Sequence, residues 1–426
     1  MGNDFKKVNI NDKIVLKGGA IMKSQEEIFG MALGIADPLY IEKIEFDKPT
    51  GELHIYVDFK RGSKFTCSEC GIAGCSVHDT TDKTWRHLNF FQYKSYIHFR
   101  TPSTKCDNCG VRLFSPEWSR PRSGFTLLFE TFVVVLAREM PISKIAEIVD
   151  ENDTRIWRIV AAHVNKAYSE KDFSNVTKVG VDETSSRKGH KYVSVFVDMV
   201  KKEILFATKG KDAKTIETFA EELPKHNGKT DNIKEVSMDM SPAFIKGARD
   251  FLGKASITFD KFHVTKQLNE ALDEVRRSEQ KSSPLLKGSR YIWLKNPSKL
   301  TASQATSLVT LSKENRKVAK VYQMKLTFQD IYKAFGDIAS ADLAMKKWLS
   351  WAMRSRIEPV KKFAKMVKSH YSGIMRYFES NLTAGISEGI NSRIQEIKRR
   401  GKGYKNIDNF IIMIYLEGSK LILPAF

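Results

Sequence analysis

The chain has 426 residues, of which 70 are Lys or Arg and 50 are Asp or Glu, and its formal charge is +20. Hydrophobic residues make up 42% of the sequence, which excludes a disordered chain and allows several domains with buried cores. The positive excess favours a polyanion, either nucleic acid or an anionic membrane surface. The longest apolar run, residues 125–137, contains Glu130 and is shorter than the ~18 residues that a membrane span needs. The first residues lack the apolar core of a signal peptide, so we expect no membrane partner and a cytoplasmic, nucleoid-associated protein.

Residues 1–60 are expected to form an N-terminal segment with a short strand pair at 40–59, and residues 61–120 a zinc-ribbon DNA-binding domain. The second segment contains two Cys-x2-Cys-Gly knuckles, formed by Cys67 with Cys70 and by Cys106 with Cys109. Two such knuckles complete a tetrahedral four-thiolate site for a structural Zn²⁺ ion, and a strand pair would fill the residues between them. The alternative is a set of buried free cysteines or a redox pair. Cys75 is expected to be an ordinary small apolar residue.

Residues 121–170 are expected to form a helix-turn-helix domain. Apolar residues recur at helical spacing on both sides of a polar break at 150–154. They are Ile142, Ile145, Ala146, Ile148 and Val149 before the break, and Ile156, Ile159, Val160 and Val164 after it. Asp153 or Thr154 would cap the second helix, and Arg155 and Arg158 would point outward near its start, where such proteins contact bases. Any antiparallel helix pair gives a similar pattern, but the zinc module and the basic charge favour DNA binding.

Strands and helices alternate from residue 178 to 262 in the order β-β-β-α-β-α-β. The predicted strands are 178–185, 191–200, 203–210, 235–240 and 256–262, and the predicted helices are 213–226 and 241–253. Asp182 would end the first strand and Asp239 the fourth. These strands are neighbours in a ribonuclease-H-like sheet, so the two carboxylates would lie close together at the edge where α/β sheets collect their chemistry. Two carboxylates repel unless a cation lies between them, and Mg²⁺ (or Mn²⁺) is a hard, oxygen-seeking cation.

A third carboxylate is expected from residues 381–406. Glu388 lies early in a predicted helix, and Glu396, eight residues further on, is its competitor. Basic residues follow on the same helix and are expected to bind DNA phosphates: Lys398, Arg399, Arg400, Lys402 and Lys405. The alternative for each acid is an ordinary turn or surface residue, since most exposed acids are simply solvated.

Several blocks of the sequence together resemble the bacterial insertion-sequence transposases of the ISL-three family, over nearly the whole chain from about residue 40. Besides the knuckles and the helix pair, they are VGVDETS, SMDMSPAF, DKFHVTKQLNEALDEVRR and AGISEGINSRIQEIKRRGKGYKN. The resemblance implies a DDE triad on a ribonuclease-H-like fold, carried over as Asp182, Asp239 and Glu388. It also implies that Asp260 and His263 match an Asp-x2-His motif, with His263 near the scissile phosphate. The alternative for His263 is a core histidine at a helix start.

The expected fold is therefore a multidomain α/β protein, in which a zinc ribbon and a helix-turn-helix precede the catalytic domain. That domain is expected at 171–280 and 376–410, interrupted by an all-helical insertion at 281–375 and followed by a C-terminal tail at 411–426. The insertion contains Trp293, Trp348 and Trp351. Trp293 is a candidate to stack on an unpaired base at a transposon end, with core packing as the alternative.

These features predict a DNA transposase that binds the terminal inverted repeats of an insertion sequence and cleaves and joins double-stranded DNA with metal ions held by the triad. Two ends must be cut together, so a homodimer or a larger synaptic assembly is expected. A metal-dependent nuclease of the same fold and a non-catalytic DNA-binding regulator are the alternatives. Joined products would distinguish the transposase from the nuclease, and any cleavage would exclude the regulator.

Overall fold

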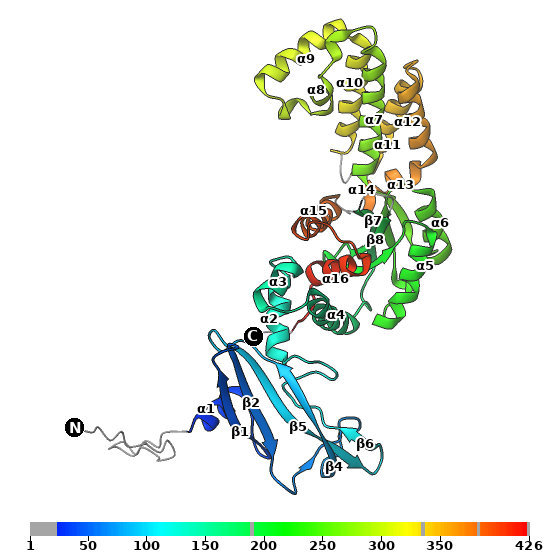
Figure 1. Cartoon of the computed structure of the whole chain (residues 1–426). Coiled ribbons are helices and arrows are strands. Elements are labelled where there is room, and N and C mark those ends of the chain that lie inside the picture. Colours follow the sequence, from blue (N-terminus) through cyan, green and yellow to red (C-terminus); the bar gives the residue numbers. More distant parts are fainter. Residues whose placement is uncertain (1–23, 188–190, 334–336, 381–383, 424–426) are drawn as a thin grey trace, which may run out of the picture. The chain divides into compact units, whose positions relative to one another are not determined.

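The computed structural model describes residues 24–187, 191–333, 337–380 and 384–423 (Figure 1). These residues divide into two compact units, one ending at Leu136 and the other running from Ala137 to Leu423. No helix among them is long and apolar enough to cross a membrane.

The first unit is built on one six-stranded sheet. Helix α1 (Gln25–Leu33) precedes the strands β1 (Leu39–Asp47), β2 (Glu52–Phe59), β3 (Lys64–Phe65), β4 (Cys75–Arg86), β5 (Lys94–Cys106) and β6 (Gly110–Leu113). The sheet order is β1-β2-β5-β4-β3, with β6 paired to β5. Every second residue of β2 is buried, and these side chains pack with Trp85, Ile97 and Phe99. The expected boundary at residue 60 therefore falls inside one sheet, because the predicted strand pair and the cysteine-bearing strands share a core.

Helix α2 (Leu127–Ala137) is followed by the predicted helix pair, α3 (Ile142–Val149) and α4 (Asp153–Ser169). The apolar face of α4 is buried as expected, but Ile148 of α3 is 56% exposed. The predicted cap is also wrong. Neither Asp153 nor Thr154 caps α4; the side chain of Asn152 accepts a hydrogen bond from the backbone N–H of Thr154 at 2.9 Å, which satisfies a free donor of the first turn.

The α/β part of the second unit has the predicted order of elements. The strands are β7 (Lys178–Arg187), β8 (Lys191–Asp198), β9 (Glu203–Lys209), β10 (Glu235–Met238) and β11 (Ser256–Phe259), and the helices are α5 (Ala213–Glu222) and α6 (Pro242–Phe251). They form a five-stranded sheet in the order β11-β10-β7-β8-β9. β7, β8 and β9 pair antiparallel, whereas β10 pairs parallel with both β7 and β11. The first and fourth strands of the unit are therefore neighbours, as predicted.

Helices make up the rest of the second unit. They are α7 (Lys261–Glu279), α8 (Arg290–Leu294), α9 (Ala302–Glu314), α10 (Arg316–Ile331), α11 (Ile338–Met353), α12 (Glu358–Ser369), α13 (Tyr371–Met375), α14 (Tyr377–Ser380), α15 (Ala384–Arg400) and α16 (Ile407–Gly418). Helix α7 starts directly after β11 and runs into the bundle formed with α10, α11 and α12 (Figure 1). One continuous core includes Phe259 of the sheet, Leu268 of α7 and Trp348 of α11.

The segment expected to be a C-terminal tail contains most of α16, which is a buried helix. Its Tyr415 hydroxyl accepts a hydrogen bond from the backbone N–H of Ala207 in β9 at 3.0 Å, and its ring lies 4.3 Å from that of Tyr168 in α4. Gly418 lies so close to Ile204 that a Cβ at this position would be 2.3 Å from the Ile204 side chain. Helix α16 therefore packs between the edge strand of the sheet and the second helix of the predicted helix pair.

Candidate functional site

The two cysteine knuckles come together in the first unit. The sulfur atoms of Cys67, Cys70, Cys106 and Cys109 all lie within 4.8 Å of one another. A tetrahedral Zn²⁺ ion with Zn–S bonds of ~2.3 Å needs sulfur atoms about 3.8 Å apart, so this donor set fits the ion. Each knuckle ends in a glycine with positive φ, 75° at Gly71 and 72° at Gly110, which lets the backbone turn back toward the sulfur atoms. The predicted grouping of four cysteines is confirmed.

Local hydrogen bonds give the thiols unequal acidity. The backbone N–H groups of Cys109 and Asn108 lower the pKa of Cys106 to about 7, because they stabilise its thiolate. The hydrogen bond with Cys70 and burial raise the pKa of Cys109 to about 12. Cys75 is buried in the same cluster, where burial raises its pKa, and its Sγ lies 3.5 Å from the carbonyl oxygen of Ile72. A neutral thiol at Cys75 is consistent with the predicted apolar role.

A second group of candidate residues meets at the strands β7 and β10. Gly180 pairs with Ser237, so the same register extended by two residues sets Asp182 level with Asp239. The expectation that Asp182 ends its strand is wrong, because β7 continues to Arg187 by pairing with β8 beyond the reach of β10. Asp239 does follow the end of β10, and its carboxylate accepts a hydrogen bond from the backbone N–H of Ser241 at 2.9 Å, just before α6.

Glu388 of α15 reaches the same place. A pocket of about 340 Å³ is lined by Asp182, Asp260, Phe262, His263, Glu388, Asn391, Ser392, Gln395 and Arg399. Asp239 lines an adjoining pocket of about 300 Å³, and His263 borders both. Glu396, the competitor, is exposed and lines neither pocket. Asp182, Glu388 and His263 therefore share one pocket, with Asp239 on the other side of the histidine.

Three polar contacts hold α15 over β7. The amide of Asn391 donates a hydrogen bond to Oδ2 of Asp182, and the amide of Gln395 donates to Oγ1 of Thr184 at 3.4 Å. Lys398 donates from Nζ to the carbonyl oxygen of Ser185. The donors recur at every third or fourth residue, so one face of α15 contacts β7 and presents Glu388 to the pocket.

Negative charge accumulates in the pocket. Burial raises the pKa of Asp260, and the charges of Asp182 and Glu388 raise it further, against a hydrogen bond from the backbone N–H of Phe262 and the charge of His263. Burial also raises the pKa of Glu183, with contributions from Asp239 and Asp182 that Lys211 opposes. Carboxylates that disfavour one another's charged form are a suitable environment for a divalent cation.

The carboxylates are more widely spaced than the thiols. Among the described residues, the four cysteines alone form a group of three or more candidate metal ligands whose donor atoms all lie within 4.8 Å of one another. The three acids do not meet this criterion.

His263 and Phe262 border the pocket from the start of α7. Asp260 caps this helix by accepting a hydrogen bond from the backbone N–H of Phe262 at 2.8 Å. His263 places Nε2 3.9 Å from Oδ1 of Asp182, and its ring is perpendicular to that of Phe262, which is 56% exposed. Phe262 and Asn391 were not among the residues predicted from the sequence. The spacing of Asn391, three residues after Glu388, is the signal that would have found it.

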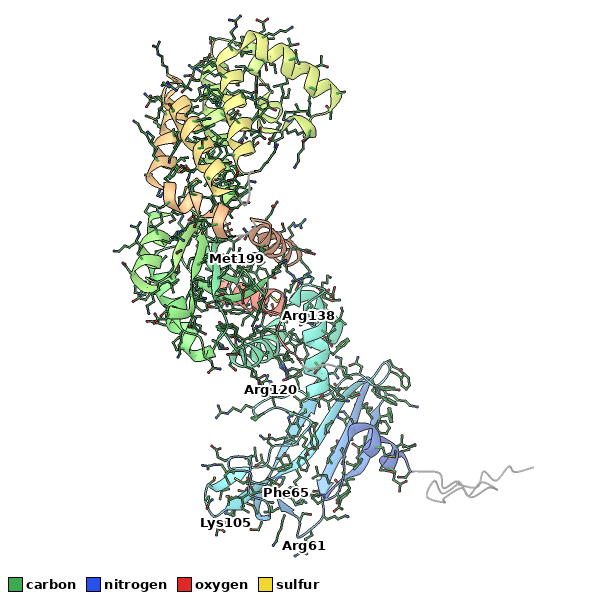
Figure 2. The ribbon with its side chains drawn as sticks, turned by 180° about the vertical axis from the view of Figure 1, so that it is seen from behind. Arg61, Phe65, Lys105, Arg120, Arg138 and Met199 are labelled. Carbon is green, nitrogen blue, oxygen red and sulfur yellow. The ribbon has the colours of Figure 1, made fainter. Side chains whose placement is uncertain are left out.

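The predicted DNA-binding residues differ in their surroundings. Arg155 and Arg158 are exposed on α4, and Arg155 forms an ion pair with Glu151 at 2.6 Å. Arg399 lines the pocket, whereas Arg400 forms an ion pair with Glu417 of α16. Lys402 and Lys405 are exposed. In the first unit, Arg61 is exposed in the turn between β2 and β3, and Lys105 is exposed on β5 directly before Cys106 (Figure 2).

Trp293 is not available to stack on a base. It is 1% exposed, and its Nε1 donates a hydrogen bond to Oγ of Ser289 at 3.2 Å. Trp348 is 2% exposed and donates to the carbonyl oxygen of Met324 at 2.8 Å. Both rings fill the core of the helical bundle. The exposed aromatic side chain of the pocket is instead Phe262.

Comparison with known proteins gives three family matches. The model of the ISL3 DDE domain, described as "Transposase", matches residues 179–414. The "Helix-turn-helix domain of transposase family ISL3" matches residues 115–164, and the "zinc-finger of transposase IS204/IS1001/IS1096/IS1165" matches residues 63–109.

Curated relatives match over most of the chain. The transposase for insertion sequence element IS1001 of Bordetella parapertussis is 28% identical over 384 residues, which cover 88% of this chain and 94% of the relative. The transposase for insertion sequence element IS1557 of Mycobacterium tuberculosis is 25% identical over an alignment of 439 positions, gaps included, that spans 93% of this chain and 97% of the relative.

Proposed function

Because the chain belongs to the ISL3 family of insertion-sequence transposases, we propose that it cuts and joins DNA in the pocket between β7, the start of α7 and α15. The observation that carries this proposal is the convergence of Asp182 and Glu388 on one pocket, with Asp239 level with Asp182 directly after the neighbouring strand β10. The DNA substrates are the terminal inverted repeats of the insertion sequence and the target duplex. The strand order, with the first and fourth strands adjacent and parallel, supports a ribonuclease-H-like fold for this unit.

Asp182, Asp239 and Glu388 would hold Mg²⁺ (or Mn²⁺), and Zn²⁺ would be held by the four cysteines. Bound Mg²⁺ supplies an activated water and stabilises the charge that develops on the phosphodiester and its leaving oxygen. The carboxylates offer the hard oxygen donors that this cation prefers.

The other pocket residues would orient the reactants. Asn391 fixes the rotamer of Asp182 through its hydrogen bond and leaves Oδ1 of that carboxylate toward His263. His263 would then donate a hydrogen bond to a phosphate oxygen or take a proton from the attacking hydroxyl. Arg399, at the pocket wall, would contact the phosphodiester. After cleavage, the free 3′-hydroxyl of the element would attack target DNA in the same pocket.

The zinc module and the helices α3 and α4 would recognise the element's ends. The exposed Arg155 and Arg158 near the start of α4 have the position from which helix-turn-helix proteins contact bases. The basic excess of the chain would add salt-dependent affinity for the DNA backbone. Synapsis of two ends requires a homodimer or a larger assembly.

The test compares Glu388→Gln with Glu396→Gln, because both residues lie on α15 and only Glu388 lines the pocket. The substrate is a labelled duplex carrying the element's own end, with Mg²⁺ and target DNA. We expect Glu388→Gln to lose at least 100-fold in cleavage and joining while DNA binding is kept, and Glu396→Gln to retain both reactions.

Three outcomes would contradict the proposal. Equal activity of the two variants would remove Glu388 from the site. Cleavage without joined products would identify a nuclease, and DNA binding without cleavage by the unmodified protein would identify a regulator.

A further inference from the structure

A groove on the far side of α6 has no part in the pocket described above. It encloses about 850 Å³ and lies between α6, the strand β11 and the short helix α13. The lining contains four cationic side chains, Lys246, Arg249, Lys254 and Arg376, and a single carboxylate, that of Asp250. The groove is therefore strongly basic, in contrast to the acidic pocket.

The cations of this groove are exposed and mostly unpaired. Lys254 forms an ion pair with Asp231 at 2.6 Å. Lys246, Arg249 and Arg376 are exposed, and no acidic side chain among the described residues lies within ion-pair distance of them. The charge of Arg249 also acts on His370 in the groove wall, whose pKa is lowered by burial and by this neighbouring cation. An anion in the groove would relieve this unbalanced charge.

The floor of the groove is rigidly built. Helix α13 crosses the edge strand β11 so closely that a Cβ at Gly373 would lie 2.5 Å from the ring of Phe259 and 3.2 Å from the carbonyl oxygen of Ile257. Lys246 and Arg249 are three residues apart and thus share one face of α6. Arg376, directly after α13, lines the same groove. Two separate elements therefore contribute cations to it.

The groove starts beside the catalytic pocket and leads away from it. Its lining includes Pro242, three residues after Asp239, and Phe259, directly before Asp260. It ends at Gly253 and Lys254, beyond the other end of α6. A helix of 10 residues is about 15 Å long, and along that length of its axis a B-form duplex presents about four phosphates of one strand.

We propose that this groove binds the phosphodiester backbone of the DNA strand that leaves the catalytic pocket. The inference rests on the proposed function, because it takes the substrate to be DNA. The acidic pocket repels a phosphodiester, and a basic groove at its side supplies the attraction that holds the strand while metal ions enter. The spacing of cations along α6 suits a repeating anion rather than a single small one.

The first test measures how DNA affinity depends on salt in the full chain without divalent metal. The groove variant carries Lys246→Gln, Arg249→Gln and Arg376→Gln. The control carries Lys313→Gln, Lys320→Gln and Lys365→Gln, three exposed residues of α9, α10 and α12 outside the groove. Each lost phosphate contact lowers the slope of log K against log salt by ~0.9, so we expect a decrease approaching 3 in the groove variant. An equal change in the control, or none in the groove variant, would overturn the proposal.

The second test locates the DNA without removing charge. Ser372 is an exposed, neutral residue of the groove, and Ser303 is an exposed residue of α9 outside it. With a duplex that carries a thiol tether at single positions, we expect Ser372→Cys to form a disulfide cross-link within about four nucleotides of the scissile phosphate. Unmodified protein and Ser303→Cys are the controls. A yield no higher than theirs would assign the groove to another occupant, such as an extended peptide paired with β11.

Neither test requires turnover. Protein that binds and cross-links in the groove but does not cleave would contradict the catalytic proposal alone. Cleavage that depends on Glu388, together with unchanged DNA affinity in the groove variant and no cross-link at Ser372, would contradict only the groove proposal.

Discussion

The side-chain amide of Asn391 donates a hydrogen bond to Oδ2 of Asp182, which lies 209 residues earlier in the chain. This bond joins α15 to the central strand β7 and fixes one oxygen of the carboxylate that the catalytic proposal depends on. Because the amide donates to a proposed metal ligand, its effect should appear in the metal dependence of the reaction.

We expect Asn391→Ala to raise the Mg²⁺ concentration needed for half-maximal cleavage by about 10- to 100-fold, the usual range for partners of metal ligands. The measurement is the cleavage rate as a function of Mg²⁺ concentration. Arg393→Ala is the control, because Arg393 is exposed and does not line the pocket. An unchanged metal dependence in Asn391→Ala would show that the hydrogen bond does not position Asp182.

We expect one Zn²⁺ ion per chain, bound by the four clustered thiols. Cys106→Ala should abolish zinc binding and DNA binding together, because the metal holds two strand ends of the first unit. Cys75→Ala should keep the ion, since Cys75 lies outside the four-thiol set. The measurement is the metal content of purified protein by mass spectrometry. A zinc loss in Cys75→Ala equal to that in Cys106→Ala would refute the assignment.

Trp293 and Phe262 should respond in opposite ways to truncation. Trp293→Ala removes a buried ring, so we expect it to lower the free energy of unfolding by about 3–5 kcal/mol. Phe262→Ala changes an exposed side chain at the pocket, so the stability should change little while the cleavage rate falls. Thermal unfolding and single-turnover cleavage of both variants test this. Full activity of Phe262→Ala would exclude a contact between its ring and the substrate.

Lys325 gives the helical bundle a pH dependence. Its Nζ is buried and donates to the carbonyl oxygens of Leu294 at 2.6 Å and Trp293 at 3.3 Å, and burial lowers its pKa from 10.5 to about 8. Between these values the unfolded chain binds more protons than the folded one, so stability rises with pH in this window. We expect the unmodified protein to gain up to about 3 kcal/mol relative to Lys325→Met as the pH rises from 8 toward 10. Parallel calorimetric curves for the two proteins would contradict this.

The sequence predicted local elements well where short periodicities repeat. The order of elements along the chain follows from alternating apolar runs and short connections, and the pairing of β7 with β10 was expected from the topology of a ribonuclease-H-like sheet. The cysteine cluster follows from spacing alone. The end of β7 could not be predicted, because pairing with β8, not the identity of Asp182, extends the strand to Arg187. The sequence around Trp293 does not distinguish a buried ring from an exposed one, because tryptophans of either kind occur among basic residues.

Contacts between residues far apart in the chain could not be predicted from the sequence either. Nothing in residues 411–426 indicated that Tyr415 would bond with Ala207, so this apolar stretch was taken for a tail. The contact between Asn391 and Asp182 required the fold to bring α15 over β7. Asp182 and Asp239 were found because strand position and residue type agreed, whereas Asn391 had only its spacing of three residues after Glu388 as a signal.

The position of α16 has a consequence for judging copies of such elements in genomes. A reading frame interrupted just before Ile407 would still encode every acid of the pocket and every cysteine of the zinc module. Its product would nevertheless lack helix α16, so β9 would lose the helix that packs on it and the ring of Tyr168 would lose its contact with Tyr415. Exposed apolar surface of this kind favours proteolysis of a chain in the cell. An inventory of intact copies that checks only the acidic triad would therefore count genes whose product lacks this packing.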